Sequence, residues 1–87
     1  MKKYILSPNI ELQPLEDSLV VLALEKNTYY SLNGSGRWFF EHILKSPLDD
    51  VVRDAQQHFS GVSEDALRRD CIELIELLES AGIIRGE

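Results

Sequence analysis

The sequence predicts an α+β fold of winged-helix-like type, in which a three-stranded antiparallel sheet is followed by three helices. Three observations predict it. Residues 4–32 consist of short β-rich runs separated by turn residues, whereas residues 33–81 follow a helical period. The chain has 87 residues and 44% apolar residues, which suits one modest core. We therefore expect a single domain that covers residues 1–87.

The strands are expected in three runs. The run 10–15 alternates apolar and polar residues until Pro14 ends regular pairing. The run 19–25 is mostly apolar, as in a central strand whose two faces are both partly covered. The run 28–32 follows a hairpin turn in which Asn27 can adopt a left-handed conformation. A sheet of three such strands leaves at least one edge open unless a helix covers it.

The third strand, 28–32, has two different faces. Tyr30 and Leu32 lie on one face, and Tyr29 and Ser31 lie on the other. The strand contains no Pro, Lys or Glu that would block its edge. Its edge is therefore available for pairing with another chain.

The first helix begins after Asn33 or Ser35, either of which can act as its cap. At about 100° per residue, one face of this helix holds four residues: Gly36, Phe40, Ile43 and Leu44. Phe39 lies at the border of this face. Trp38 lies nearly opposite, so we expect it at the surface.

The second helix has a clear start, with Ser46 as the N-cap, Pro47 at the first helical position and Asp49 at the capping-box position. Its apolar stripe contains five residues: Leu48, Val51, Val52, Ala55 and Phe59. Gly61 ends it.

The third helix begins after Ser63 and ends at Gly82. One stripe holds five small or apolar residues: Leu67, Cys71, Leu74, Leu78 and Ala81. Three more broaden the apolar surface: Ile72, Ile75 and Leu77. Residues 83–85 follow as a short extended tail.

The formal net charge of −6 comes from 15 acidic and 9 basic residues, and the basic residues are scattered. Nucleic-acid-binding proteins usually show a basic patch. The third helix, between residues 63 and 81, carries six acids against two bases. A phosphate-lined groove would repel such a helix, so we expect no nucleic acid as a partner.

The longest apolar run, residues 19–24, has six residues, whereas a membrane span needs about 20. The two lysines near the N-terminus are not followed by an apolar stretch of about seven residues, which predicts no signal peptide. The single cysteine fits a reducing compartment. We therefore expect a cytoplasmic protein without membrane contact.

Residues that could perform catalysis are few. His42 and His58 lie on different helices, without a nucleophile or further metal ligands at suitable spacing. Cys71 falls on an apolar stripe, where a thiol behaves as a small hydrophobe. The segment "NGSG" at 33–36 lacks the remaining residues of a phosphate-binding loop. We therefore expect no enzyme activity, no metal and no cofactor.

One pattern covers nearly the whole chain and begins with "YYSLNGSG" at residues 29–36. It continues on the first and third helices at these positions: Phe39, Phe40, Ile43, Asp70, Cys71, Leu74, Ile75, Leu78 and Gly82. In this order and spacing the chain resembles the PqqD-like family, also called recognition elements of ribosomally synthesised and post-translationally modified peptides. It departs from the family where Phe39 and Phe40 replace an aliphatic or Trp pair, and where Cys71 replaces a Val.

The resemblance implies a non-catalytic domain that binds the leader segment of a precursor peptide. The leader would add as an antiparallel strand to the edge of strand 28–32, with apolar side chains in a groove against the third helix. The peptide-binding residues expected on this basis are Thr28, Tyr29, Tyr30, Ser31, Leu32, Asp70, Leu74, Leu77 and Leu78. For four of them a purely structural role in the core is the alternative: Tyr30, Leu32, Leu74 and Leu78.

The resemblance also implies partners. A free-standing chain of this size is similar to the recognition protein of split lasso-peptide systems, which delivers the precursor to a leader peptidase and a cyclase. It is also similar to the chaperone of pyrroloquinoline quinone biosynthesis, which presents a peptide to a radical-SAM enzyme. We favour the lasso system, and we expect a monomer or a weak homodimer that pairs through the open edge.

Proteins of other classes provide alternatives. A winged-helix transcription factor would need a basic face, which the sequence does not show. A toxin–antitoxin or anti-factor protein would fit the acidity and the small size. Binding to a leader peptide rather than to a folded partner separates that class from a peptide-recognition domain.

Overall fold

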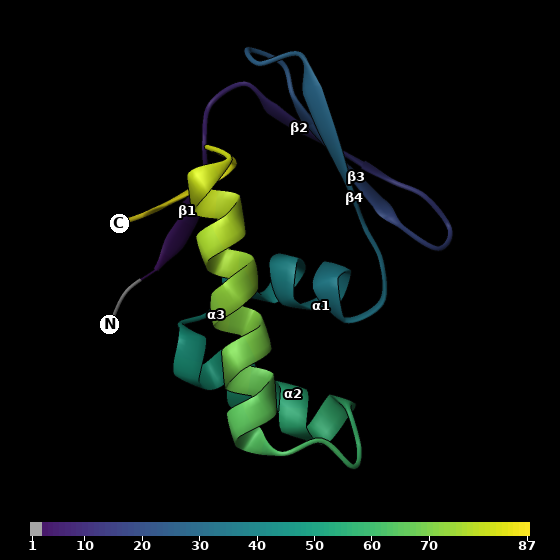
Figure 1. Cartoon of the computed structure of the whole chain (residues 1–87), viewed down its shortest axis with the longest axis vertical. Helices are drawn as coiled ribbons and strands as arrows, with labels where there is room; N and C mark the ends of the chain where they lie inside the picture. Colours follow the sequence, from purple (N-terminus) through teal and green to yellow (C-terminus); the bar gives the residue numbers. More distant parts are fainter. Residues whose placement is uncertain (1–2) are drawn as a thin grey trace.

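The computed structural model describes residues 3–87, so the first two residues of the predicted domain lie outside the described range. The elements are, in order, β1 (Tyr4–Leu6), β2 (Ile10–Pro14), β3 (Leu19–Ala23), β4 (Thr28–Leu32), α1 (Gly34–Ile43), α2 (Leu48–His58), α3 (Glu64–Ser80) and β5 (Ile84–Gly86). Figure 1 shows the sheet of β2, β3 and β4 on one side of the long helix α3, with α1 and α2 beside that helix. The predicted α+β order is confirmed.

The strands β2, β3 and β4 form an antiparallel sheet in that order, as predicted. Leu19 pairs with Leu32 and Val21 pairs with Tyr30. Asn27, in the turn before β4, has a φ of 53°, which is the expected left-handed conformation. Within the described residues β4 pairs with β3 alone, so its outer edge is open.

A second, two-stranded sheet joins the two ends of the described chain. β1 pairs antiparallel with β5, and Tyr4 lies opposite Gly86. The amide of Ser7 donates a hydrogen bond to the carbonyl of Ile83 at 2.9 Å. The prediction of a simple extended tail missed this pairing. It forms because Ile83 and Ile84 are buried and the backbone that carries them needs hydrogen-bond partners.

The core is apolar and draws on every element except β2 and β4. Its buried residues are Tyr4, Leu19, Val21, Phe39, Phe40, Ile43, Val51, Val52, Ala55, Leu67, Cys71, Ile75, Leu78, Ile83 and Ile84. Phe39 is therefore buried in the core, whereas the sequence placed it at the border of the apolar face of its helix. On α3 the buried stripe includes Ile75 and leaves Leu74 only half-buried, which rotates the stripe relative to the prediction. The described part contains no buried polar or charged side chain.

The start of α2 differs by one residue from the prediction. Pro47, not Ser46, is the N-cap, because its ψ of 158° is still extended, and no side chain caps the helix. The amide of Val51 donates to the carbonyl of Pro47 at 3.0 Å. Asp49 forms no capping box there; its carboxylate accepts a hydrogen bond from Arg68 at 2.8 Å.

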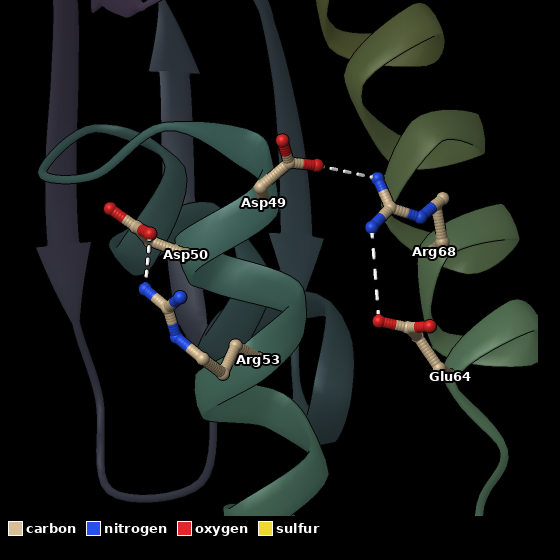
Figure 2. A network of polar contacts seen from close by, with 5 residues as sticks. All are labelled: Asp49, Asp50, Arg53, Glu64 and Arg68. Carbon is tan, nitrogen blue, oxygen red and sulfur yellow. Dashed lines mark hydrogen bonds and ion pairs between the residues drawn. The ribbon is translucent and has the colours of Figure 1, made fainter.

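Ion pairs connect the starts of α2 and α3. Figure 2 shows Arg68 reaching Asp49 on α2 and Glu64 on its own helix. Nη1 of Arg68 lies 2.8 Å from Oδ1 of Asp49, and Nη2 lies 4.0 Å from Oε1 of Glu64. The hydrogen bond to Asp49 is the main cause that raises the pKa of Arg68. A separate pair within α2 joins Asp50 to Arg53.

Trp38 belongs to an aromatic cluster and is half-buried, so the prediction of a surface residue is wrong. Its indole stacks on the ring of His42, with centroids 3.7 Å apart, and on the ring of His58, with centroids 5.2 Å apart. Phe59 meets it edge-on at 5.4 Å. The single-helix pattern misplaced Trp38 because the end of α2 packs on the outer face of α1.

Candidate functional site

A groove lies where the start of α1 meets the middle of α3, and its volume is about 450 Å³. It is lined by Ser35, Gly36, Phe39, Asp70, Glu73, Leu74 and Leu77. We call these seven residues the α1–α3 groove. Because β4 leads directly into α1, as Figure 1 shows, the groove lies next to the end of the open sheet edge.

Three of the four predicted α3 residues line this groove: Asp70, Leu74 and Leu77. At about 100° per residue they share one narrow face of α3, beside the buried stripe. Leu77 is apolar yet 55% exposed. Leu78 is only 1% exposed and lies in the core, which is the alternative that the sequence left open for it.

β4 brings the other five predicted residues to the open edge. Three of them are exposed: Thr28, Tyr29 and Ser31. Tyr29 is 71% exposed, which is a large fraction for an aromatic side chain. Tyr30 and Leu32 are half-buried and pack against the core. A methyl group of Leu32 lies 4.0 Å from the point that a Cβ on Gly36 would occupy, so the strand and the groove adjoin each other.

Four residues of the groove were not among the predicted site residues: Ser35, Gly36, Phe39 and Glu73. Helical spacing was a usable signal for Glu73, which lies three residues after Asp70 and four before Leu77. No such signal exists for the α1 residues, because only tertiary packing places α1 against this face of α3.

β4 and α3 run in opposite directions. The turn before β4 lies at the C-terminal end of α3, where Nζ of Lys26 donates to the carbonyl of Ala81 at 2.9 Å. The last residue of β4, Leu32, adjoins Gly36, which lines the groove together with Asp70. Figure 1 shows the same arrangement. A strand added antiparallel to β4 would therefore run in the same direction as α3.

Cys71 and His42, whose side chains are of types often used in catalysis or metal binding, do not line the groove. Burial raises the pKa of the Cys71 thiol to about 11, so the thiol is protonated at neutral pH. The Nδ1 atom of His42 lies 2.7 Å from the carbonyl oxygen of Trp38, and its ring is covered by the indole. In residues 3–87, no three His, Cys, Asp or Glu side chains are grouped so that they could hold a metal ion.

The helices are short or polar relative to the demands of a lipid bilayer. None of the helices in residues 3–87 combines the length and the apolar character that a membrane span requires.

Comparison with known families decides the classification. The family described as "Coenzyme PQQ synthesis protein D (PqqD)" matches residues 18–84. This chain belongs to the PqqD family. The matched segment contains β3, β4, the three helices and every residue of the α1–α3 groove. The groove therefore lies entirely within the part of the chain that matches the family.

Two solved structures share the fold of this PqqD family member. One is described as "Lasso peptide synthetase B1 complexed with the leader peptide"; it is 20% identical, the match covers 95% of this chain and 98% of that chain, and the TM-score is 0.88. The other is described as "TbiB1 in Complex with the TbiA(beta) Leader Peptide"; it is 17% identical, with 93% and 94% coverage and a TM-score of 0.85. A search of the curated proteins found no match.

Proposed function

We propose that this protein binds the leader peptide of a ribosomally synthesised precursor peptide. The leader adds as a fourth, antiparallel strand to the open edge of β4 and places alternate side chains in the α1–α3 groove. The observation that carries this proposal is the position of a partly apolar groove beside an unpaired strand edge in residues 3–87. In such a complex, backbone hydrogen bonds supply affinity and the side-chain pockets supply specificity.

The composition of β4 supports strand addition. Its sequence, TYYSL, contains no proline that would interrupt the ladder and no charged side chain that would repel a partner strand. Tyr29 stands on the exposed face, where its ring can cover a neighbouring strand. The side chains proposed to contact the leader are Thr28, Tyr29, Tyr30, Ser31, Leu32, Asp70, Leu74 and Leu77.

The proposed role in the pathway is delivery without catalysis, in the cytoplasm, where ribosomal precursors are made. A protein that binds both a substrate and its enzyme raises the effective concentration of the substrate. The two structures with the same fold are described as complexes with leader peptides, and one of them is described as a lasso peptide synthetase B1. This favours a leader peptidase and a cyclase of lasso-peptide biosynthesis as the enzymes that receive the precursor.

A second candidate function is favoured by the family description itself, which names coenzyme PQQ synthesis. In that case the chain would present its precursor peptide to a radical-SAM enzyme. The same edge and groove would hold the peptide, so the two candidates differ in the peptide and in the enzyme, and not in the binding mode.

A fluorescence-anisotropy titration tests the proposal. The full chain is titrated against labelled leader peptides of lasso precursors and against the labelled precursor of pyrroloquinoline quinone. Scrambled peptides of equal composition and a duplex DNA are the controls. We expect binding of one leader class with a Kd below about 1 µM, which corresponds to about 8 kcal/mol, and no binding of the controls.

The outcome also separates the two candidates. Binding of lasso leaders alone supports delivery to a peptidase and a cyclase, and binding of the quinone precursor alone supports the second candidate. If circular dichroism shows a folded sample that binds neither class, the proposed function is wrong.

A further inference from the structure

We propose that the α1–α3 groove selects leader segments in which a basic residue stands two positions before an apolar residue. The pattern, read from the N-terminus, is Lys or Arg, then any residue, then an apolar residue. This inference rests on the proposed function, because it describes the peptide that the same groove takes. It follows from the charges of the groove, their spacing and the direction of β4.

Two carboxylates of the groove are left without a partner by the described part of the chain. Asp70 and Glu73 both line it, and both are exposed. Within residues 3–87 neither side chain forms an ion pair or a hydrogen bond. The lining of the groove contains no Lys, Arg or His. A peptide that enters it therefore meets an uncompensated negative potential, in a chain whose formal net charge is −6.

The two cations of α3 do not neutralise this potential. Arg68 is held between Asp49 and Glu64, as Figure 2 shows. Arg69 lines a second depression on the outer face of the helix, of about 390 Å³, to which Glu73 also contributes. Within residues 3–87, however, no ion pair joins Arg69 to Glu73. A cation for the groove must therefore come from the ligand, and opposite charges across an interface favour the matching partner.

The spacing of the groove residues sets the distance between the two ligand side chains. The midpoint of Asp70 and Glu73 precedes the midpoint of Leu74 and Leu77 by four helical positions. At 1.5 Å per residue this is about 6 Å along α3. In a strand, residues i and i+2 point to the same side and lie about 6.7 Å apart. A strand that runs along α3 therefore places one side chain at the carboxylates and the next one on the same side at the leucines.

The direction of β4 sets the order of the two ligand residues. An antiparallel strand on β4 runs in the same direction as α3, because the start of β4 lies at the end of α3, where Lys26 contacts Ala81. It passes the carboxylates first, because Asp70 and Glu73 lie N-terminal to Leu77 on α3. The basic residue therefore precedes the apolar one. Addition in the parallel sense would give the reverse order, so the order of the motif also reports the sense of the added strand.

A selection experiment with random peptides tests this pattern and does not require the natural leader. A phage-displayed library of random twelve-residue peptides is selected against the full chain and against the double variant Asp70→Asn/Glu73→Gln. A second double variant, Glu16→Gln/Asp54→Asn, is the matched control. It removes the same charge from exposed sites in the β2–β3 turn and on α2, away from the groove.

We expect Lys or Arg two positions before an apolar residue in peptides selected by the wild type and by the control variant, but not in those selected by Asp70→Asn/Glu73→Gln. A synthetic peptide of the selected sequence should lose about fivefold in affinity for the wild type when its basic residue becomes Gln. The same exchange should change its affinity for Asp70→Asn/Glu73→Gln by less than about twofold, and high salt should reduce the difference.

The outcomes distinguish this inference from the proposed function. The inference is overturned if the selected peptides bind at the β4 edge without a basic residue. It is also overturned if exchange of the basic residue for Gln changes the affinity equally for both double variants. Either result leaves the proposed function in place. A folded wild-type chain that selects no peptide overturns both.

Discussion

Leu77 lies on the proposed binding surface and can be compared with an apolar residue on the ordinary surface of the same helix. It is apolar and 55% exposed, and it lies in the α1–α3 groove next to Leu74. Ile72 is the matched case on the same helix, because it is apolar and 38% exposed but lies outside this groove, in the outer depression. The pair allows the contribution of the groove to be measured against an equal change elsewhere.

We expect Leu77→Asp to weaken leader binding by about tenfold or more, because it removes an apolar contact and adds a third negative charge to the groove. Ile72→Asp should leave the affinity within about twofold. Anisotropy titrations measure both affinities, and urea denaturation should show that each variant is as stable as the wild type within about 1 kcal/mol. Equal binding by Leu77→Asp and the wild type would contradict the assignment of the groove.

Cys71 gives a prediction that depends on pH. Burial raises its pKa from 9.0 to about 11, so the folded state binds the proton more tightly than the unfolded state does. The resulting stability is fully present below pH 9 and is lost as the pH rises towards 11. We expect the wild type to lose about 2 kcal/mol more than Cys71→Val between these values. Urea denaturation at each pH measures the difference, and parallel curves for the two proteins would contradict the prediction.

At the scale of elements, the open edge of β4 makes a prediction about the ligand backbone. In an antiparallel pair, every second residue of a strand directs its N–H and C=O towards the neighbour. N-methylation of the leader at single positions should therefore weaken binding with a period of two along the peptide. We expect about a tenfold loss at the positions that face β4 and little change at the others.

This period is specific to strand addition. A helical or irregular ligand in the same groove would show a period of three to four or none, so a scan without alternation would contradict addition to β4. The scan uses the leader identified by the anisotropy titration and leaves the protein unchanged, which keeps folding out of the comparison.

At the scale of the whole molecule, the pairing of β1 with β5 closes the chain on itself. Ile83 follows the end of α3 and is fully buried, and its carbonyl accepts the hydrogen bond from Ser7. The N-terminal strand therefore helps to cover the core that positions α3, although it lies far from the groove in sequence.

We expect Ile83→Ala to destabilise the protein by about 3 kcal/mol, because it leaves a cavity in a packed core. Val62→Ala, at a position that is 42% exposed, should change the free energy of unfolding by less than about 0.5 kcal/mol. Urea denaturation monitored by circular dichroism measures both. A loss below about 1 kcal/mol for Ile83→Ala would show that this side chain does not support the core.

Local patterns were sufficient for most of the elements. The β-rich runs in residues 10–32 and the helical period afterwards predicted the sheet β2-β3-β4 and the three helices, because composition and periodicity are properties of neighbouring residues. The left-handed Asn27 and the Ser63 cap also followed from local chemistry. The residues of β4 and four positions on α3 were predicted as peptide-binding residues from these patterns together with the family resemblance, and three of the four α3 positions line the groove.

Other features depend on contacts between residues far apart in the chain, which local patterns do not contain. The pairing of β1 with β5 and the stacking of Trp38 against His58 both arise where two elements meet. The groove is a further case, because Phe39 and Glu73 come from helices that only folding brings together. Periodicity shows which residues share a face of one element, whereas packing of the whole chain determines which faces are buried and which remain free to bind.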